Sequence, residues 1–87
     1  MPTSEEIKTI LDEALALEGR ALAFTRESEL LGAVPEFDSM AVVSLIAALE
    51  ERLGIVVDDD DITAETFETV GNLVDFVQEK YEQQQVS

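Results

Sequence analysis

The chain has 87 residues, which suits one compact domain, 1–87, with a thin core and little room for a deep enzyme active site. Twenty Asp and Glu against five Lys and Arg give a formal net charge of −15. That charge disfavours nucleic acid and anionic membranes as partners and favours basic protein patches, although acidity also serves solubility alone. Cysteine and histidine are absent, which removes disulfides, thiolate nucleophiles and imidazole chemistry. With no signal-peptide features and no stretch near the ~20 apolar residues that span a bilayer, we expect a cytoplasmic protein.

The first predicted helix covers about residues 4–17. Thr3 and Glu6 have the spacing of a capping box, which satisfies free amides at a helix start. Gly19 marks the expected exit of this helix. Apolar residues follow the helical period at Ile7, Ile10, Leu11, Ala14 and Leu15.

Residues 18–38 show no sustained period, and so they predict a long loop between the first two helices. Such a loop needs anchors on the core, and the alternative is that it forms a ligand-binding loop. The predicted anchors are Leu22, Phe24, Leu30, Leu31, Val34 and Phe37.

The second helix is predicted to begin with Asp38 as N-cap and Ser39 in the first turn, and to end at the C-cap Gly54. The inward stripe is predicted to be Val42, Leu45, Ile46, Leu49 and Leu53. A second stripe of Met40, Val43 and Ala47 lies about a third of a turn away, and we expect it to be exposed. The alternative is that the long loop covers this stripe, with Phe37 or Leu31 above it.

The remaining segments predict a packed loop at 55–57, a short helical turn near 60–65 and a last helix over 70–81 capped by Thr69. Residues 82–87 are expected to fray, which leaves an ordered core of about 4–81. The apolar residues predicted to face inward from the last helix are Val70, Leu73, Val74, Val77 and Tyr81. The predicted fold is all-α, a four-helix bundle of three longer helices and one short one.

The run Asp58–Asp61 raises the question of calcium binding. An EF-hand loop needs a Gly at its sixth position and a Glu at its twelfth, and counting from Asp58 these positions are Thr63 and Thr69. We therefore expect a solvated run that caps a helical turn, and no metal site.

The sequence Asp38-Ser39-Met40 at a helix start resembles the Asp-Ser-Leu motif of acyl carrier proteins. The resemblance continues through Leu45–Gly54 and Thr69–Val74 and covers about residues 34–78. It implies a 4′-phosphopantetheine group on Ser39, with Asp38 as the second residue of the cofactor site. The group would be donated by coenzyme A through a separate phosphopantetheinyl transferase. Cargo would then be held as a thioester on the arm, in lipid or polyketide-type biosynthesis, by a protein that is not itself an enzyme.

Three other functions stay open on the residues alone. An aminoacyl or peptidyl carrier shares the design with a serine at the start of the second helix. An acidic helical adaptor would use Ser39 as a plain helix-start residue. A carboxylate-based enzyme is the least favoured, because the sequence shows no pair of acids set in a cleft.

The resemblance also implies a partner surface on and beside the second helix. Its expected residues are Asp38 and Glu36, Met40, Val43, Ala47, Glu50 and Glu51. Expected partners are the transferase, an acyl- or aminoacyl-loading ligase and acyl-using enzymes with basic docking patches, while the chain itself is expected to be monomeric.

The sequence departs from the common pattern of fatty-acid carriers at three positions. Met40 replaces Leu, and Ala41 and Ser44 stand where acids are frequent. Pro35-Glu36-Phe37 and Leu22-Ala23-Phe24-Thr25 resemble specialised stand-alone bacterial carriers that work with acyl-CoA-ligase-like enzymes.

Overall fold

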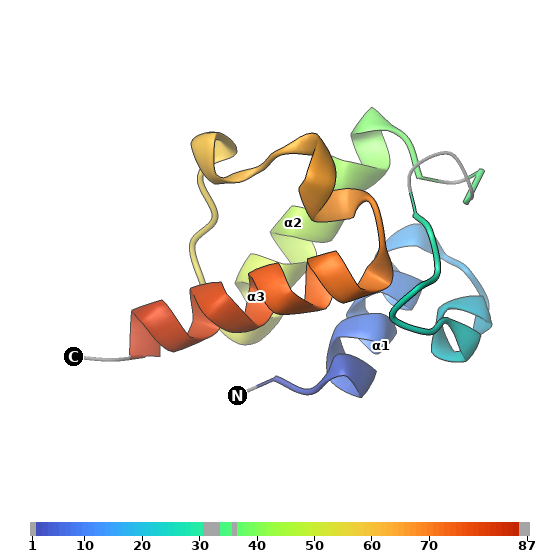
Figure 1. The fold of residues 1–87 in the computed structure, drawn as a ribbon, viewed down its shortest axis with the longest axis horizontal. Coiled ribbons are helices and arrows are strands. Elements are labelled where there is room, and N and C mark those ends of the chain that lie inside the picture. Colours follow the sequence, from blue (N-terminus) through green and yellow to red (C-terminus); the bar gives the residue numbers. More distant parts are fainter. Residues whose placement is uncertain (1, 31–33, 36, 86–87) are drawn as a thin grey trace.

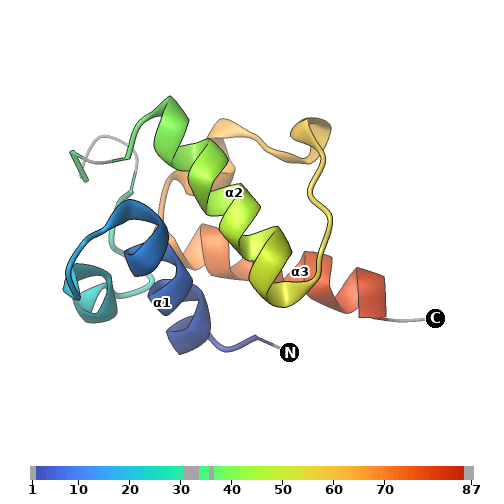
Figure 2. The same cartoon turned by 180° about the vertical axis from the view of Figure 1, so that it is seen from behind.

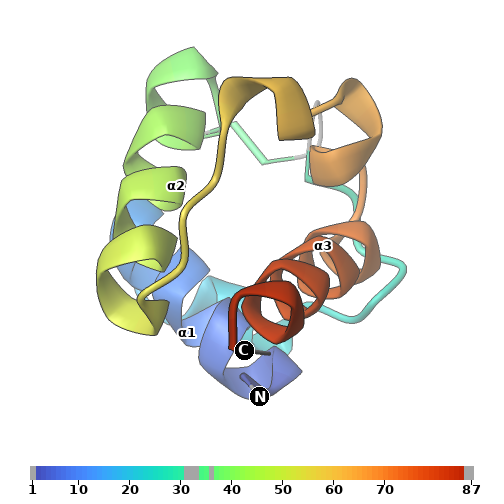
Figure 3. The same cartoon turned by 90° about the vertical axis from the view of Figure 1, so that its left-hand side faces the viewer.

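Three α-helices and three 3₁₀ turns form the fold, in a computed structural model that describes residues 2–30, 34–35 and 37–85. α1 lies beside α2, while η2 and η3 cross above the space between α2 and α3 (Figures 1 and 3). The elements are α1 (Ser4–Leu15), η1 (Arg20–Ala23), α2 (Ser39–Leu53), η2 (Asp59–Asp61), η3 (Ala64–Phe67) and α3 (Val70–Gln85). The all-α prediction is confirmed, but the single short helix expected near 60–65 is two 3₁₀ turns. No helix within the described ranges combines the length and apolar character needed to cross a membrane.

The start of α1 is as predicted, but its end is not. The Glu6 amide donates to the Thr3 hydroxyl at 3.1 Å. The helix stops at Leu15, and Ala16, rather than Gly19, is the left-handed C-cap with φ 53°. The prediction failed because Gly19 (φ 92°) belongs to the next turn, as the N-cap of η1.

A side-chain bond from α1 explains this early ending. Both carboxylate oxygens of Asp12 accept the Gly19 amide at 2.8 Å, and the Asp12 carbonyl accepts the Leu17 amide at 3.0 Å. The chain therefore folds back onto α1, and Leu17 is buried.

The long loop between α1 and α2 is anchored by apolar side chains. Leu30, Val34 and Phe37 are buried as predicted, and Phe24 is half-buried. Leu22 was predicted to be an anchor, but it is 49% exposed because Ala21 takes the inward position in η1. The remaining predicted anchor, Leu31, lies outside the described residues.

Backbone hydrogen bonds tie the same loop to the start of α3. The Val70 amide donates to the Ser28 carbonyl at 2.9 Å and the Gly71 amide to the Arg26 carbonyl at 2.9 Å. In return, the Leu30 amide donates to the Glu68 carbonyl at 3.0 Å. A Cβ at Gly71 would lie 3.0 Å from the Arg26 carbonyl oxygen, so this close approach favours glycine.

The core lies between the three helices and is closed by η3. On α2 the fully inward positions are Ala41, Leu45 and Leu49, whereas Val42, Ile46 and Leu53 of the predicted stripe are only half-buried. The core-facing side of α2 is therefore centred on Ala41, Leu45 and Leu49, and not on the predicted stripe that begins at Val42. On α3, Val70, Leu73, Val74 and Val77 are buried as predicted, and Tyr81 is half-buried.

The C-terminal end of α3 lies beyond the predicted end of the last helix at residue 81. The helix continues to Gln85, and the side-chain amide of Gln84 bonds to both polar groups of the Val56 backbone. Its Oε1 accepts the Val56 amide at 2.7 Å, and its Nε2 donates to the Val56 carbonyl at 2.8 Å. These two hydrogen bonds connect the last turn of α3 to the 55–57 loop, in which Ile55 is buried.

Replacing Gln84 with alanine should loosen the 55–57 loop, because both bonds to Val56 are lost. Each such bond is worth about 1 kcal/mol at most, so a small fall in melting temperature is expected. Amide hydrogen exchange at Val56 should become faster in Gln84→Ala than in the control Gln83→Ala, whose side chain bonds only within α3. Equal exchange in the two variants would contradict this role of Gln84.

Candidate functional site

The N-terminus of α2 is fixed by one carboxylate. Asp38 has extended backbone angles (φ −121°, ψ −171°), and its Oδ1 accepts the Ala41 amide at 2.9 Å. The Asp38 carbonyl accepts the Val42 amide at 3.0 Å, which starts the helical bonding pattern. The predicted N-cap is confirmed, and it places Ser39 as the first residue of the helix.

Ser39 is exposed in the first turn, between two buried positions at Phe37 and Ala41. At such a helix start the first amides point away from the helix and the dipole is positive. An anionic group attached to the Ser39 hydroxyl would meet favourable electrostatics there. The acid next to it, Asp38, uses its Oδ1 for capping.

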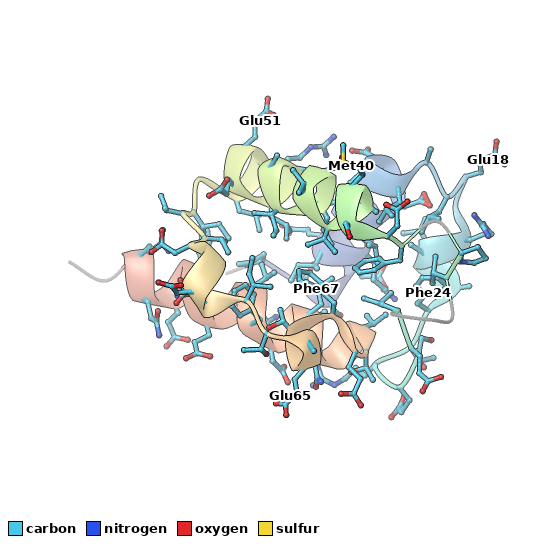
Figure 4. The ribbon with its side chains drawn as sticks, turned by 90° about the horizontal axis from the view of Figure 1, so that it is seen from above. Glu18, Phe24, Met40, Glu51, Glu65 and Phe67 are labelled. Carbon is cyan, nitrogen blue, oxygen red and sulfur yellow. The ribbon has the colours of Figure 1, made fainter. Side chains whose placement is uncertain are left out.

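The buried rings of Phe37 and Phe67 pack against each other on the inner side of the start of α2. Their ring centroids are 5.5 Å apart, with the planes tilted by 50°. Both are buried, at 6% and 3% exposure, so the chain enters α2 directly from the core. Sequence reasoning missed Phe67, since only its position in the short η3 turn brings it under the start of α2. Figure 4 shows Phe67 on the inner side of α2, away from Met40.

An apolar stripe continues from Ser39 along the outer side of α2. Met40 is 72% exposed, Val43 is 62% exposed and Ala47 is exposed. In Figure 4, Met40 and Glu51 point outward from the same side of α2. The predicted exposure of this stripe is confirmed, and Phe37, the described residue of the two suggested as a cover, is buried in the core.

The predicted acidic residues of the partner surface do not share one environment. Asp38 and Glu51 are exposed. Glu50 is half-buried, and its Oε2 accepts the Val57 amide at 2.9 Å, which gives it a part in holding the 55–57 loop. Glu36 lies outside the described residues. Of the predicted acids that the structure describes, Asp38 and Glu51 are therefore the exposed ones.

The acidic run at 58–61 is held by a lysine of α3. Lys80 Nζ lies 2.8 Å from Asp61 Oδ2 and 5.9 Å from the centre of the Phe76 ring. This hydrogen bond from Lys80 holds the pKa of Asp61 below its ordinary value. Among the residues that the structure describes, no three His, Cys, Asp or Glu side chains gather as metal ligands would.

The chain matches known proteins along most of its length. A family model described as the phosphopantetheine attachment site matches residues 5–77. The solution NMR structure of a holo acyl carrier protein from Nitrosomonas europaea is 49% identical, with a TM-score of 0.84 over 94% of this chain and 99% of that chain. Acyl carrier proteins from strains of Clostridium perfringens are 47% identical over 45 residues, which is 52% of this chain and 57% of theirs.

These matches and the site geometry define a phosphopantetheine-attachment domain. The chain belongs to the acyl carrier protein family. The match spans little more than half the length of the Clostridium relatives, whereas it spans nearly all of the Nitrosomonas structure.

The Lys80–Asp61 pair predicts a pH-dependent stability difference. Because the pKa of Asp61 is lowered in the folded state, the pair stabilises the fold above the unfolded-state value of about 3.9. That contribution is lost as the pH falls through the lower folded-state pKa. Asp61→Asn should therefore be less stable than the parent chain in urea unfolding at pH 7, and the gap should close as the pH falls below the lowered folded-state pKa of Asp61.

Asp60→Asn provides the matched control for this experiment, since Asp60 is an exposed neighbour outside the pair. A stability gap for Asp61→Asn that persists unchanged at low pH would show that the carboxylate charge is not its cause.

Proposed function

We propose that this chain carries acyl groups as thioesters on a 4′-phosphopantetheine arm joined to Ser39. The observation that carries the proposal is the exposed Ser39 in the first turn of an Asp-capped α2, in a member of the acyl carrier protein family. The holo protein from Nitrosomonas europaea, which bears its prosthetic group, supports the same assignment.

The residues around Ser39 fit a phosphodiester. Its negative charge would lie at the positive end of the α2 dipole, near first-turn amides. Exposed Ser39 and Met40 leave space for an arm that leaves the surface. When attached, the arm supplies a terminal thiol that this cysteine-free chain lacks, and an acyl group is held there as a thioester.

Ser39 acts in this proposal as the accepting hydroxyl. Its Oγ forms a bond to the phosphorus that carries the pantetheine half of coenzyme A, and the phosphorus–oxygen bond to the adenosine half breaks. Adenosine 3′,5′-bisphosphate leaves, and the serine proton passes to a base of the transferase. This division of labour suits a chain without histidine, in which Asp38 serves as a cap.

The outer side of α2 is the surface we propose for docking. Its apolar centre is Met40, Val43 and Ala47, with Asp38 and Glu51 as its acidic rim. Glu36 precedes this set in the sequence, and Glu50, next to Glu51, is engaged with Val57. The partners that fit are enzymes that attach the arm or load and use its cargo through basic patches with an apolar centre. In this proposal the carrier has no turnover of its own.

Ser39→Ala should abolish arm attachment. After incubation with coenzyme A and a promiscuous phosphopantetheinyl transferase, the parent chain should gain the mass of one phosphopantetheine group, and the variant should gain nothing. The fold should survive, because an exposed first-turn serine contributes little to packing. Ser44→Ala, which changes the other serine of α2, is the control and should be modified normally.

Two results would go against the proposal. Modification of Ser39→Ala would place the arm elsewhere, and an unmodified parent chain would favour an acidic adaptor instead.

Val43→Asp should impair docking without unfolding the chain. An exposed substitution rarely costs more than about 0.5 kcal/mol, so the melting temperature should barely change. The rate of arm attachment by the same transferase should fall clearly, because a charge enters the apolar centre of the docking surface.

Val56→Asp is the matched control, because Val56 is also 62% exposed but lies in the loop after α2. An attachment rate equally reduced in the two variants would mean that the effect comes from added charge anywhere on the molecule.

A further inference from the structure

A groove runs between α1 and the C-terminal half of α2. Figure 2 shows these two helices side by side. The groove has a volume of about 460 Å³. Its lining is Ile10, Glu13 and Ala14 from α1 and Ala48, Glu51 and Arg52 from α2.

The apolar floor of the groove results from small side chains. Ala14 and Ala48 are half-buried, and Ile10, at 4% exposure, belongs to the core beneath them. Because alanine reaches only to its Cβ, the two helices leave space above these positions where larger side chains would interlock. An apolar side chain of a partner protein could therefore pack on Ala14 and Ala48.

One cation and several carboxylates surround this floor. Arg52 pairs with Glu13 across the groove, and both side chains are about half exposed, at 50% and 51%. Arg52 also borders two neighbouring hollows of about 290 and 360 Å³, which add Glu5 and Glu6 to the acidic rim. An ion pair this exposed is worth about 1 kcal/mol at most, so another cation can replace Arg52 on Glu13.

We propose that this α1–α2 groove is a second docking site, which takes a basic amphipathic helix of a partner protein. An apolar side chain of that helix lies on Ala14 and Ala48, and a Lys or Arg beside it pairs with Glu13 or Glu51. Charge complementarity selects this occupant, because the rim is acidic on a chain of net charge −15. The same charge disfavours a second copy of this chain.

The groove lies at the opposite end of α2 from Ser39. Ser39 and Arg52 are separated by nearly the whole 15-residue helix, or about 20 Å at 1.5 Å per residue. A helix in the groove therefore leaves Ser39 and Met40 accessible. The site goes beyond the proposed carrier function and does not depend on an arm at Ser39, although Glu51 borders both the groove and the α2 docking surface.

The test titrates the ¹⁵N-labelled chain with a synthetic helical peptide of Lys and Leu, with one apolar face, at about 0.15 M salt to screen unspecific attraction. Saturable NMR shifts should centre on the amides of Ile10, Ala14, Ala48 and Arg52. Ala48→Leu, which fills the groove, should weaken binding about tenfold, equivalent to ~1.4 kcal/mol. Ala64→Leu, at an exposed alanine of η3 outside both docking surfaces, should leave affinity unchanged.

Arg52→Gln should change the peptide affinity in the opposite direction to Ala48→Leu. It removes the cation that competes for Glu13, so the peptide should bind several-fold more tightly. Since Arg52 is exposed, this variant also remains informative if Ala48→Leu fails to fold. Ser39→Ala should bind the peptide like the parent chain, so the groove and the carrier proposal can fail separately.

Other outcomes would overturn the groove assignment. These are shifts centred on Met40 and Val43, diffuse shifts that do not saturate, no binding at all, or weaker binding by Arg52→Gln.

Discussion

The hydrogen bond from the Ala41 amide to the Asp38 carboxylate determines where α2 begins, and the candidate site depends on that position. Because Asp38 is the cap, Ser39 is the first helical residue, close to amides that have no partner within the helix. If the helix began one turn later, the hydroxyl of Ser39 would leave the positive end of the dipole. An N-cap bond of this kind contributes about 1 kcal/mol, so a modest interaction sets the electrostatics of the whole site.

The cap holds its place because the chain on both sides of it is buried. Phe37 packs against Phe67, and Ala41 faces the core one turn later. Asp38 and Ser39 are therefore exposed between two fixed points, which gives an accessible hydroxyl on a rigid support. The loop that leads to Phe37 is fastened in turn to the start of α3 through backbone bonds of Arg26 and Ser28. The position of Ser39 is thus tied to the helix farthest from it in the sequence.

Local signals in the sequence predicted the parts of the structure that local chemistry determines. Asp38, Gly54 and Thr3 were identified as caps because capping needs only residues a few positions apart. The exposed stripe from Met40 to Ala47 followed from helical periodicity alone.

The failures come from contacts between residues that are distant in the chain or placed in irregular turns. Nothing near Gln84 in the sequence indicates that its side-chain amide will form hydrogen bonds with the backbone N–H and carbonyl of Val56. Likewise, Glu50 looked like a surface acid because its partner, the Val57 amide, lies beyond the end of α2. The exposure of Leu22 depends on the direction of a 3₁₀ turn, which apolar periodicity does not encode.

The few cations of this acidic chain serve mainly to join elements. Arg26 pairs with Asp75 across the loop and α3, Arg52 with Glu13 across α2 and α1, and Lys80 with Asp61 across α3 and η2. The sequence from Ser39 to Glu51 itself contains no basic residue.

This distribution makes the two ends of α2 different for a basic partner. Near Ser39 a partner meets Asp38 and apolar side chains on a helix segment that has no Lys or Arg before Arg52, so this segment does not oppose the long-range attraction. At the α1–α2 groove a cation of the partner must displace Arg52 from Glu13 before it can pair there. The end of α2 that bears Ser39 is therefore suited to fast, reversible encounters, as the proposed carrier function requires. At the groove end Arg52 competes with the partner for Glu13, and a helix docked there leaves Ser39 free.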